Sequence, residues 1–197
     1  MFVVDDDQAM RNSLKWLIES VGVGVESFAS ADEFLAHYQA GRSGCLVLDV
    51  RMPGMSGLEL QEHLIKENIH IPVVIITGHG DVPMAVRAMK AGAVDFIEKP
   101  FNDEALLDAI RRALAYEEQQ RSHYFEHSQI KERLGHLTPR EREVMDMVTE
   151  GKSNKEIANT LGVSAKTIEA HRARVMEKMQ AGSLAELVRM ALAVSED

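Results

Sequence analysis

The fold of this chain is decided by one stretch, Cys45-Leu-Val-Leu-Asp49-Val-Arg51-Met-Pro53-Gly-Met-Ser-Gly57. A short apolar run ends on a carboxylate, and a loop rich in proline and glycine follows at once. This pattern is typical of a buried parallel strand that carries one acid at its carboxyl end. Because ligands bind beyond that end in open α/β sheets, we interpret Asp49 as the chemical centre of the chain.

Outward from this stretch, residues 1–116 alternate between strand and helix periodicity. The expected strands are Phe2–Val4, Val23–Phe28, Cys45–Asp49, Val73–Thr77 and Val94–Ile97. The expected helices are 10–21, Ala31–Gln39, Gly57–Lys66, Val82–Ala91 and Asp103–Tyr116. Five strand–helix repeats predict a parallel sheet with helices on both faces, because right-handed crossovers place helices on both sides.

Residues 117–137 lack this alternation. The segment is polar at its start, and neither proline nor glycine interrupts it before Gly135. It predicts a continuation of the fifth helix that acts as a semi-rigid linker between two domains. A weak apolar stripe along it either packs on a partner surface or only bridges the domains, and it consists of Tyr124, Phe125, Ile130 and Leu134.

Residues 138–197 show four helical patterns and no strand, which predicts a separate all-α domain. Thr138, a proline and Glu141 form the start of the first helix, and Gly151 stops it. The other helices are expected at Asn154–Leu161, from the cap Ser164 to about Met179, and at Leu184–Val194.

Composition sets further bounds on this chain of 197 residues, which has a formal net charge of −9 and one cysteine, Cys45. A single cysteine excludes an intramolecular disulfide and a cysteine-cluster metal site. No apolar run approaches the length of a membrane span, and the acidic opening lacks a basic leader. We therefore expect a cytoplasmic protein without membrane association. Because the chain starts inside an apolar strand, we expect its true start a few residues upstream.

Polar side chains stand at the carboxyl ends of the expected strands: Asp5 and Asp6 after the first, Asp49 after the third, Thr77 after the fourth and Lys99 after the fifth. Carboxylates held together repel each other, which favours a bound hard cation such as Mg²⁺. Asp49 would then attack a phosphorus centre and form an aspartyl phosphate. Lys99 would offset the added charge, and the Thr77 hydroxyl would donate to a phosphoryl oxygen.

Two competing interpretations concern single acids. Asp7 is expected to be a helix cap rather than part of the site. Haloacid-dehalogenase-like phosphatases also use a nucleophilic aspartate and Mg²⁺ on a doubly wound sheet. They need a second acid two residues after the nucleophile, where this chain has Arg51. We therefore expect a phosphoacceptor with at most slow autodephosphorylation, and not an enzyme.

Residues 1–116 resemble the receiver domain of two-component response regulators, which has a flavodoxin-like (βα)5 fold. The matching motifs are Val4-Asp5-Asp6-Asp7, Leu48-Asp49-Val-Arg51-Met-Pro53-Gly54-Met-Ser-Gly57, Thr77-Gly-His79-Gly80 and Lys99-Pro100-Phe101. The run from Thr77 to Phe101 is particularly similar to FixJ-type regulators.

This resemblance implies a role for each matching residue. Asp49 accepts phosphate from a sensor histidine kinase, Thr77 and Lys99 sense the phosphate, and Phe96 is the switch aromatic. The peptide bond between Lys99 and Pro100 is expected to be cis. Mg²⁺ is the implied cofactor, and its implied ligands are Asp5, Asp6, Asp49 and the backbone carbonyl of Arg51.

In the C-terminal domain, a helix, a short turn at Gly162 and a second helix have the sequence form of a helix-turn-helix. Ile168, Val175 and Met179 set the buried side of the second helix, with His171 at its edge. The outward residues are Lys166, Thr167, Glu169, Ala170 and Ala173, with Arg172 and Arg174 toward the flanks.

In a DNA major groove, Lys166 and Glu169 would read base edges, while the small Ala170 and Ala173 would permit close approach to thymine methyl groups. Phosphate contacts are expected from Lys155, Arg172, Arg174 and Lys178. The spacing alone leaves a second interpretation open, a helical bundle with a solvated charged face.

Residues 138–194 are similar to the LuxR-type four-helix DNA-binding domain. The similarity rests on Leu137-Thr-Pro-Arg-Glu141, Val144, Gly151, 154–158, Leu161, Val163-Ser164, Thr167-Ile168 and His171. It implies binding to double-stranded promoter DNA. The last helix, near Leu184–Ala193, would pair two monomers, so that a dimer reads a dyad-related site.

Together the resemblances imply a response regulator in which phosphorylation of Asp49 controls homodimerisation, sequence-specific DNA binding and hence transcription. The face from Val82 to Phe101 is the expected dimerisation surface. The unphosphorylated receiver is expected to restrain the C-terminal domain through residues 117–137. Two alternatives remain open: DNA binding that is independent of phosphorylation, and a phosphate relay whose helical domain binds protein.

Overall fold

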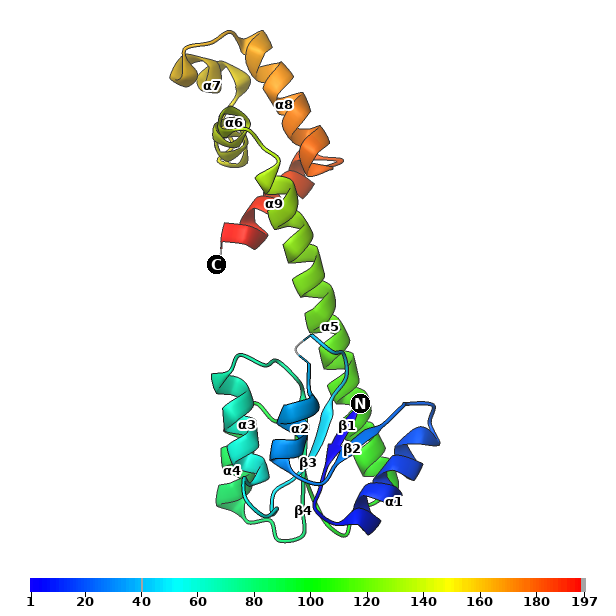
Figure 1. Ribbon diagram of the computed structural model, residues 1–197. Coiled ribbons are helices and arrows are strands. Elements are labelled where there is room, and N and C mark those ends of the chain that lie inside the picture. The colour runs from blue at the N-terminus through cyan, green and yellow to red at the C-terminus, as the bar shows by residue number, and fades with distance from the viewer. Residues whose placement is uncertain (40, 196–197) are drawn as a thin grey trace. The chain divides into compact units, whose positions relative to one another are not determined.

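The computed structural model describes residues 1–39 and 41–195, whose helices and strands are shown in Figure 1. The chain forms two compact units, the first over residues 1–120 and the second from Arg121 onward. No helix in the described part of the chain is long and apolar enough to span a membrane.

The first unit is built on a five-stranded parallel sheet. Its strands are β1 (Phe2–Val4), β2 (Glu26–Phe28), β3 (Leu46–Asp49), β4 (Val73–Thr77) and β5 (Asp95–Glu98), in the spatial order β2-β1-β3-β4-β5. The strand order reverses between β1 and β3, and a ligand crevice opens at such a point in doubly wound sheets. Val4 pairs with Leu48, so the next residues, Asp5 and Asp49, lie side by side at this point of the sheet.

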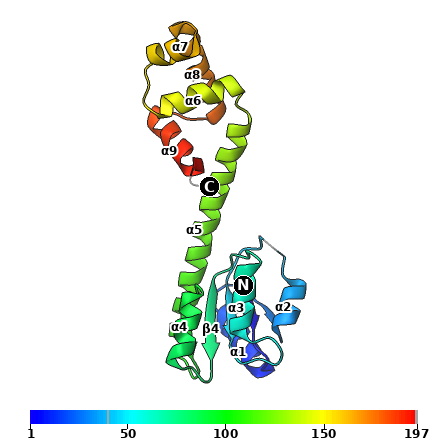
Figure 2. The same ribbon diagram turned by 90° about the vertical axis from the view of Figure 1, so that its left-hand side faces the viewer.

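Helices cover both faces of this sheet (Figures 1 and 2). They are α1 (Gln8–Glu19), α2 (Ala31–His37), α3 (Gly57–Lys66), α4 (Val82–Lys90) and the first part of α5 (Asp103–Gly135). Leu46 and Leu48 pack with α2, α3 and α4, whereas Val47 packs with α1 and α5 on the opposite face. Because both faces are filled, the central strands are unbroken apolar runs in the sequence.

The predicted fold class is confirmed, and several element bounds differ from the prediction by one to three residues; the helix expected over 10–21, for example, spans Gln8–Glu19. The strand expected over Val23–Phe28 is limited to Glu26–Phe28, the residues that pair with β1, although Val25 is buried. The strand expected over Val94–Ile97 is shifted by one residue, because pairing with β4 begins at Asp95. The helix expected over Ala31–Gln39 ends at His37, since Tyr38 is extended.

In the second unit, α5 continues to Gly135, which confirms the expected helical continuation. Four further helices follow, as predicted: α6 (Pro139–Thr149), α7 (Asn154–Leu161), α8 (Ala165–Met179) and α9 (Leu184–Ser195). Reciprocal capping boxes of Thr138 with Glu141 and of Ser153 with Glu156 begin α6 and α7. Gly162 ends α7 with a φ of 66°, a left-handed conformation that glycine adopts without strain.

The apolar stripe expected on the second half of α5 divides into two parts. Ile130 and Leu134 are buried in the core of the second unit with residues from α6, α7, α8 and α9. Tyr124 and Phe125 remain exposed by 77% and 63%. The division follows helix geometry, because residues four apart share one side of a helix whereas 124 and 125 lie off that side.

Gly57 offers a test of how closely the loop after β3 packs on its own strand. A Cβ atom at this position would lie 2.1 Å from the carbonyl oxygen of Asp49. Gly57→Ala should therefore lower the free energy of unfolding by roughly 1–3 kcal/mol, measured by urea denaturation. Gly24→Ala is the control, because nothing lies within 4 Å of a Cβ there. Equal losses in both variants would contradict the close approach.

Candidate functional site

Three side chains of the predicted site meet at the carboxyl edge of the sheet. The ammonium group of Lys99 donates hydrogen bonds to Asp5 Oδ2 and to Asp49 Oδ1, each at 2.7 Å. Asp5 and Asp49 are buried, with 1% and 5% of their surface exposed. Lys99 follows β5, its backbone N–H donates to the carbonyl of Thr77 at 2.7 Å, and its peptide bond to Pro100 is cis, as expected.

The second oxygen of each carboxylate is held by the loop that follows its strand. Asp49 Oδ2 accepts a hydrogen bond from the backbone N–H of Arg51 at 2.8 Å, and Asp5 Oδ1 accepts one from Asp7 at 2.9 Å. Arg11 Nη1 donates to the backbone carbonyl of Asp5 at 2.7 Å. Sequence reasoning did not identify Arg11, whose only signal was its place one turn into the helix after the acidic run.

The charges at this site are not balanced. Burial raises the pKa of Asp49, against the hydrogen bond and the charge of Lys99. Burial alone would lower the pKa of Lys99, but its hydrogen bonds to Asp49 and Asp5 outweigh burial and raise it. One ammonium group that stays charged at neutral pH therefore faces two carboxylates, and the excess of negative charge attracts a cation.

The other predicted residues surround this cluster. Thr77 is fully buried at the end of β4, and its Oγ1 accepts a hydrogen bond from the backbone N–H of His79 at 3.3 Å. Phe96 is half-buried in β5, and a Cβ at Gly80 would lie 3.0 Å from its ring. Asp6 has an exposed side chain.

Asp7 is the cap of α1, as predicted. Its Oδ1 accepts hydrogen bonds from the backbone N–H groups of Ala9 at 2.8 Å and Met10 at 3.4 Å. This side chain therefore serves the helix N-terminus, where an aspartate is among the preferred residues. Of the acidic run, Asp5 faces the cluster with Lys99.

The donor set fits a hard cation, although it forms no closed cage. Among the residues that the structure describes, no three histidine, cysteine or acidic side chains are grouped so that they could hold a metal ion. Mg²⁺ commonly uses one or two protein carboxylates and keeps several waters. The convergent carboxylates of Asp5 and Asp49 meet that need, and Asp6 is their neighbour in sequence. The ligand roles of Asp6 and the Arg51 carbonyl stay predictions.

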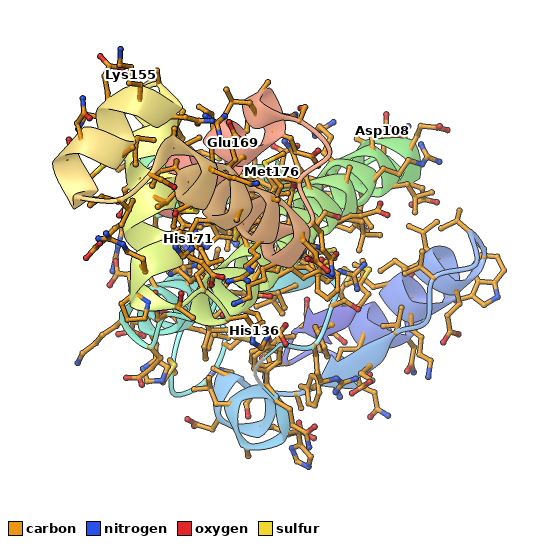
Figure 3. The ribbon with its side chains drawn as sticks, turned by 90° about the horizontal axis from the view of Figure 1, so that it is seen from above. Asp108, His136, Lys155, Glu169, His171 and Met176 are labelled. Carbon is orange, nitrogen blue, oxygen red and sulfur yellow. The ribbon has the colours of Figure 1, made fainter. Side chains whose placement is uncertain are left out.

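In the second unit, α8 has the predicted orientation. Ile168, Val175 and Met179 are buried, and His171 lies half-buried at the edge of α8 (Figure 3). The exposed side chains include Lys155 on α7 and, on α8, Lys166, Thr167, Glu169, Ala170, Ala173 and Arg174. These residues are accessible to a groove of DNA, and their individual contacts stay predictions.

Two of the expected phosphate-binding cations already have partners inside the unit. Arg172 donates to Asn154 Oδ1 at 2.7 Å, which joins α8 to the start of α7. Lys178 donates to Glu141 Oε2 at 2.6 Å and to the carbonyl of His136 at 3.1 Å. Lys178 already uses two of its three N–H donors inside the unit, so Arg174 and Lys155, which are exposed, are the better candidates.

Glu141 has a structural role that sequence reasoning found only in part. The capping box with Thr138 was predicted, but the ion pair with Lys178 was not, because 37 positions separate the two residues. Glu141 is only 3% exposed. The hydrogen bond from Lys178, followed by that from the backbone N–H of Thr138, lowers the pKa of Glu141 to about 2.

This pKa predicts acid sensitivity of the second unit. A carboxyl with a lowered pKa in the folded state contributes stability above its unfolded pKa and loses it as the pH falls. The Glu141 contribution should be full above about pH 4.5 and should fade toward pH 2. Thermal unfolding by circular dichroism should show Glu141→Gln destabilised by roughly 1–3 kcal/mol at pH 7, with a smaller deficit at pH 3.

The matched control is Glu143→Gln, which removes an exposed pair with Arg140 on the same helix. Its effect should stay below about 1 kcal/mol at every pH. A Glu141→Gln deficit that did not shrink in acid would mean that the ion pair with Lys178 does not set the pH dependence.

Comparison with known proteins gives matches over both units. Residues 1–111 match the family model of the response regulator receiver domain, and residues 135–191 match that of bacterial regulatory proteins of the luxR family. The transcriptional regulatory protein FixJ of Rhizobium meliloti (strain 1021) is 50% identical over 191 residues, which cover 97% of this chain and 94% of that protein.

Solved structures agree with these matches. The response regulator StyR has a TM-score of 0.89 and 46% sequence identity, and the match covers 97% of this chain and 96% of that one. Full-length FixJ from B. japonicum has a TM-score of 0.60 and 47% identity, with 100% and 97% of the two chains covered. The expected receiver fold, followed by a helical domain of the LuxR type, is thereby confirmed.

Proposed function

Because the chain belongs to the two-component response regulators of the FixJ type, with a receiver domain and a LuxR-type DNA-binding domain, we propose that Asp49 is its phosphoryl acceptor. The phosphoryl donor is a sensor histidine kinase. Phosphorylation then controls dimerisation and binding to promoter DNA. The observation that carries this proposal is the contact of Lys99, at 2.7 Å, with both Asp5 and Asp49 where β1 and β3 end.

The chemistry at Asp49 is a nucleophilic displacement. A carboxylate oxygen of Asp49 forms a bond to phosphorus as the phosphorus–nitrogen bond of the kinase phosphohistidine breaks, and the imidazole leaves. Lys99 keeps its charge and offsets the charge of the new phosphoryl group, which is about −1.5 to −2. Asp5, Asp6, Asp49 and the carbonyl of Arg51 would hold Mg²⁺, which neutralises charge on the phosphoryl oxygens when bound.

The switch that follows starts at Thr77. Its hydroxyl would leave the His79 N–H to donate to a phosphoryl oxygen, which displaces the loop of residues 78–81. Gly80 in that loop packs against the ring of Phe96, so the ring turns inward as the loop moves. The same motion reshapes α4, whose exposed Val82, Val86 and Met89 belong to the proposed dimerisation face.

The output is DNA binding by a two-fold dimer. The α9 helices pair the DNA-binding units, and each α8 enters a major groove of a dyad-related site. Two residues after Asp49 the chain has Arg51 and not a second acid. Because no general base stands there to activate water, only slow autodephosphorylation is proposed. Because the partners are a kinase and promoter DNA, we place the protein in the cytoplasm, without membrane association.

The central test is phosphorylation by acetyl phosphate and Mg²⁺. Intact mass should show one phosphoryl group on the wild type and on the control Asp32→Asn, and none on Asp49→Asn. The phosphorylated wild type should dimerise in light scattering. It should also bind duplexes selected from a random library about 10-fold more tightly or better. Equal dimerisation and DNA binding by Asp49→Asn would instead favour regulation that is independent of phosphorylation.

A second test concerns sequence readout by α8. The exposed carboxylate of Glu169 can accept a hydrogen bond from cytosine N4, whereas glutamine pairs with adenine. Selection from a random duplex library should show that Glu169→Gln changes the preferred base at one position in each half-site, by about 1–3 kcal/mol.

Arg174→Ala is the matched control for that experiment, because a phosphate contact carries no sequence information. It should weaken binding to all sequences alike and reduce the salt slope by about 1. An unchanged base preference in Glu169→Gln, with weaker binding overall, would contradict direct readout by this residue.

A further inference from the structure

A buried polar side chain joins two helices of the receiver at a place where an apolar residue would be expected. Gln61 lies on the buried face of α3 with Leu58, Leu60 and Leu64, and it is 2% exposed. Its amide Nε2 donates to the carbonyl oxygens of Ala88 at 3.1 Å and Ala91 at 3.0 Å. Burying an amide among apolar side chains destabilises a fold unless the amide is hydrogen-bonded. When it is, it can fix one arrangement of the elements that it joins.

The two acceptors lie at the C-terminal end of α4, where helical carbonyls lack partners within the helix. The carbonyl of Ala88 also accepts from the backbone N–H of Ala93 at 3.0 Å. Gln61 therefore caps α4 from a neighbouring helix. Its own Oε1 is buried and has no hydrogen-bond partner among the residues that the structure describes. Both N–H groups of the amide thus donate to α4, and its oxygen is left unpaired.

Apart from Met84, which is partly buried against the apolar core, few buried contacts attach α4 to the domain. Ala88 is its buried residue, whereas α3 buries five, and Val82 at its start is 77% exposed. Arg87 forms an ion pair with Glu62 of α3 at 2.7 Å, but both side chains are about half exposed, and such pairs contribute little. Helices with few buried contacts open and shift most readily.

The two ends of α4 have different neighbours. Its N-terminus follows the loop of residues 78–81, which comes directly after Thr77, while its C-terminus is held by Gln61. A displacement that starts at Thr77 therefore moves the N-terminal end of α4 against an anchor at the other end.

We propose that Gln61 is a positioning residue that anchors α4 in its unphosphorylated place and thereby opposes the switch to the active form. Releasing the anchor makes the active conformation more populated before any phosphate is present. A receiver that visits this conformation more often reacts faster with a phosphoryl donor. The proposal rests on the function proposed for Asp49.

The test uses Gln61→Leu in the full chain, because leucine fills a similar volume and removes both the donors and the unpaired acceptor. Hydrogen exchange in peptides over residues 82–94 should be about 3- to 10-fold faster than in the wild type. The rate of Asp49 phosphorylation by acetyl phosphate and Mg²⁺ should rise by a similar factor, about 3- to 10-fold. The unfolding temperature should change little, since the unpaired acceptor is lost together with the anchor.

Glu62→Ala is the matched control, because it removes the exposed ion pair between the same two helices from the α3 side. Its phosphorylation rate should stay within about 2-fold of the wild type. Gln61→Met repeats the test if the leucine variant does not fold. The anchor proposal alone would be overturned if the wild type gains phosphate at Asp49 while the Gln61 variant shows wild-type rates of hydrogen exchange and of phosphorylation. A wild type that gains no phosphate would overturn both proposals.

Discussion

The receiver domain depends on one interaction, the contact of a single lysine with two buried carboxylates. Asp5 and Asp49 end neighbouring strands, and the register of β1 with β3 sets them side by side at the reversal of strand order. Without Lys99 between them they would repel each other in a low dielectric. The remaining parts of the site serve this arrangement: the loops fix the second oxygen of each acid, and Gly57 lets the chain turn back against Asp49.

The second unit also contains a carboxylate that is paired with a lysine, but there the pKa of the carboxyl group is shifted in the opposite direction. Glu141 has one lysine to itself, accepts a backbone hydrogen bond, and has a pKa of about 2. Asp49 shares its lysine with Asp5, and burial raises its pKa. The Glu141 carboxylate, whose pKa its hydrogen bonds lower, holds helices together. The Asp49 carboxylate, whose pKa burial raises, lies at the open edge of a sheet, where it is suited to accept a charged group.

The receiver combines a rigid site with a loosely attached output element. The acids, Lys99 and Thr77 sit on buried strands whose two faces are filled, so their positions are well determined. In contrast, α4 exposes Val82, Val86 and Met89 and depends on Gln61 for a buried polar tie. Such a contrast suits a switch, because a small change at a fixed site biases an element that has two accessible positions.

The sequence by itself determined the order of strands and helices, the helix caps and the identity of the acids, Thr77 and Lys99, because periodicity and parallel topology place strand ends together whatever the details of packing. Only the tertiary structure decided which side chains touch. Lys99 meets Asp5 and Asp49 across 94 and 50 positions, and Lys178 meets Glu141 across 37. The sequence could not predict the anchor at Gln61 or the limits of β2 for the same reason. Both depend on neighbouring elements, which the periodicity within one element does not specify.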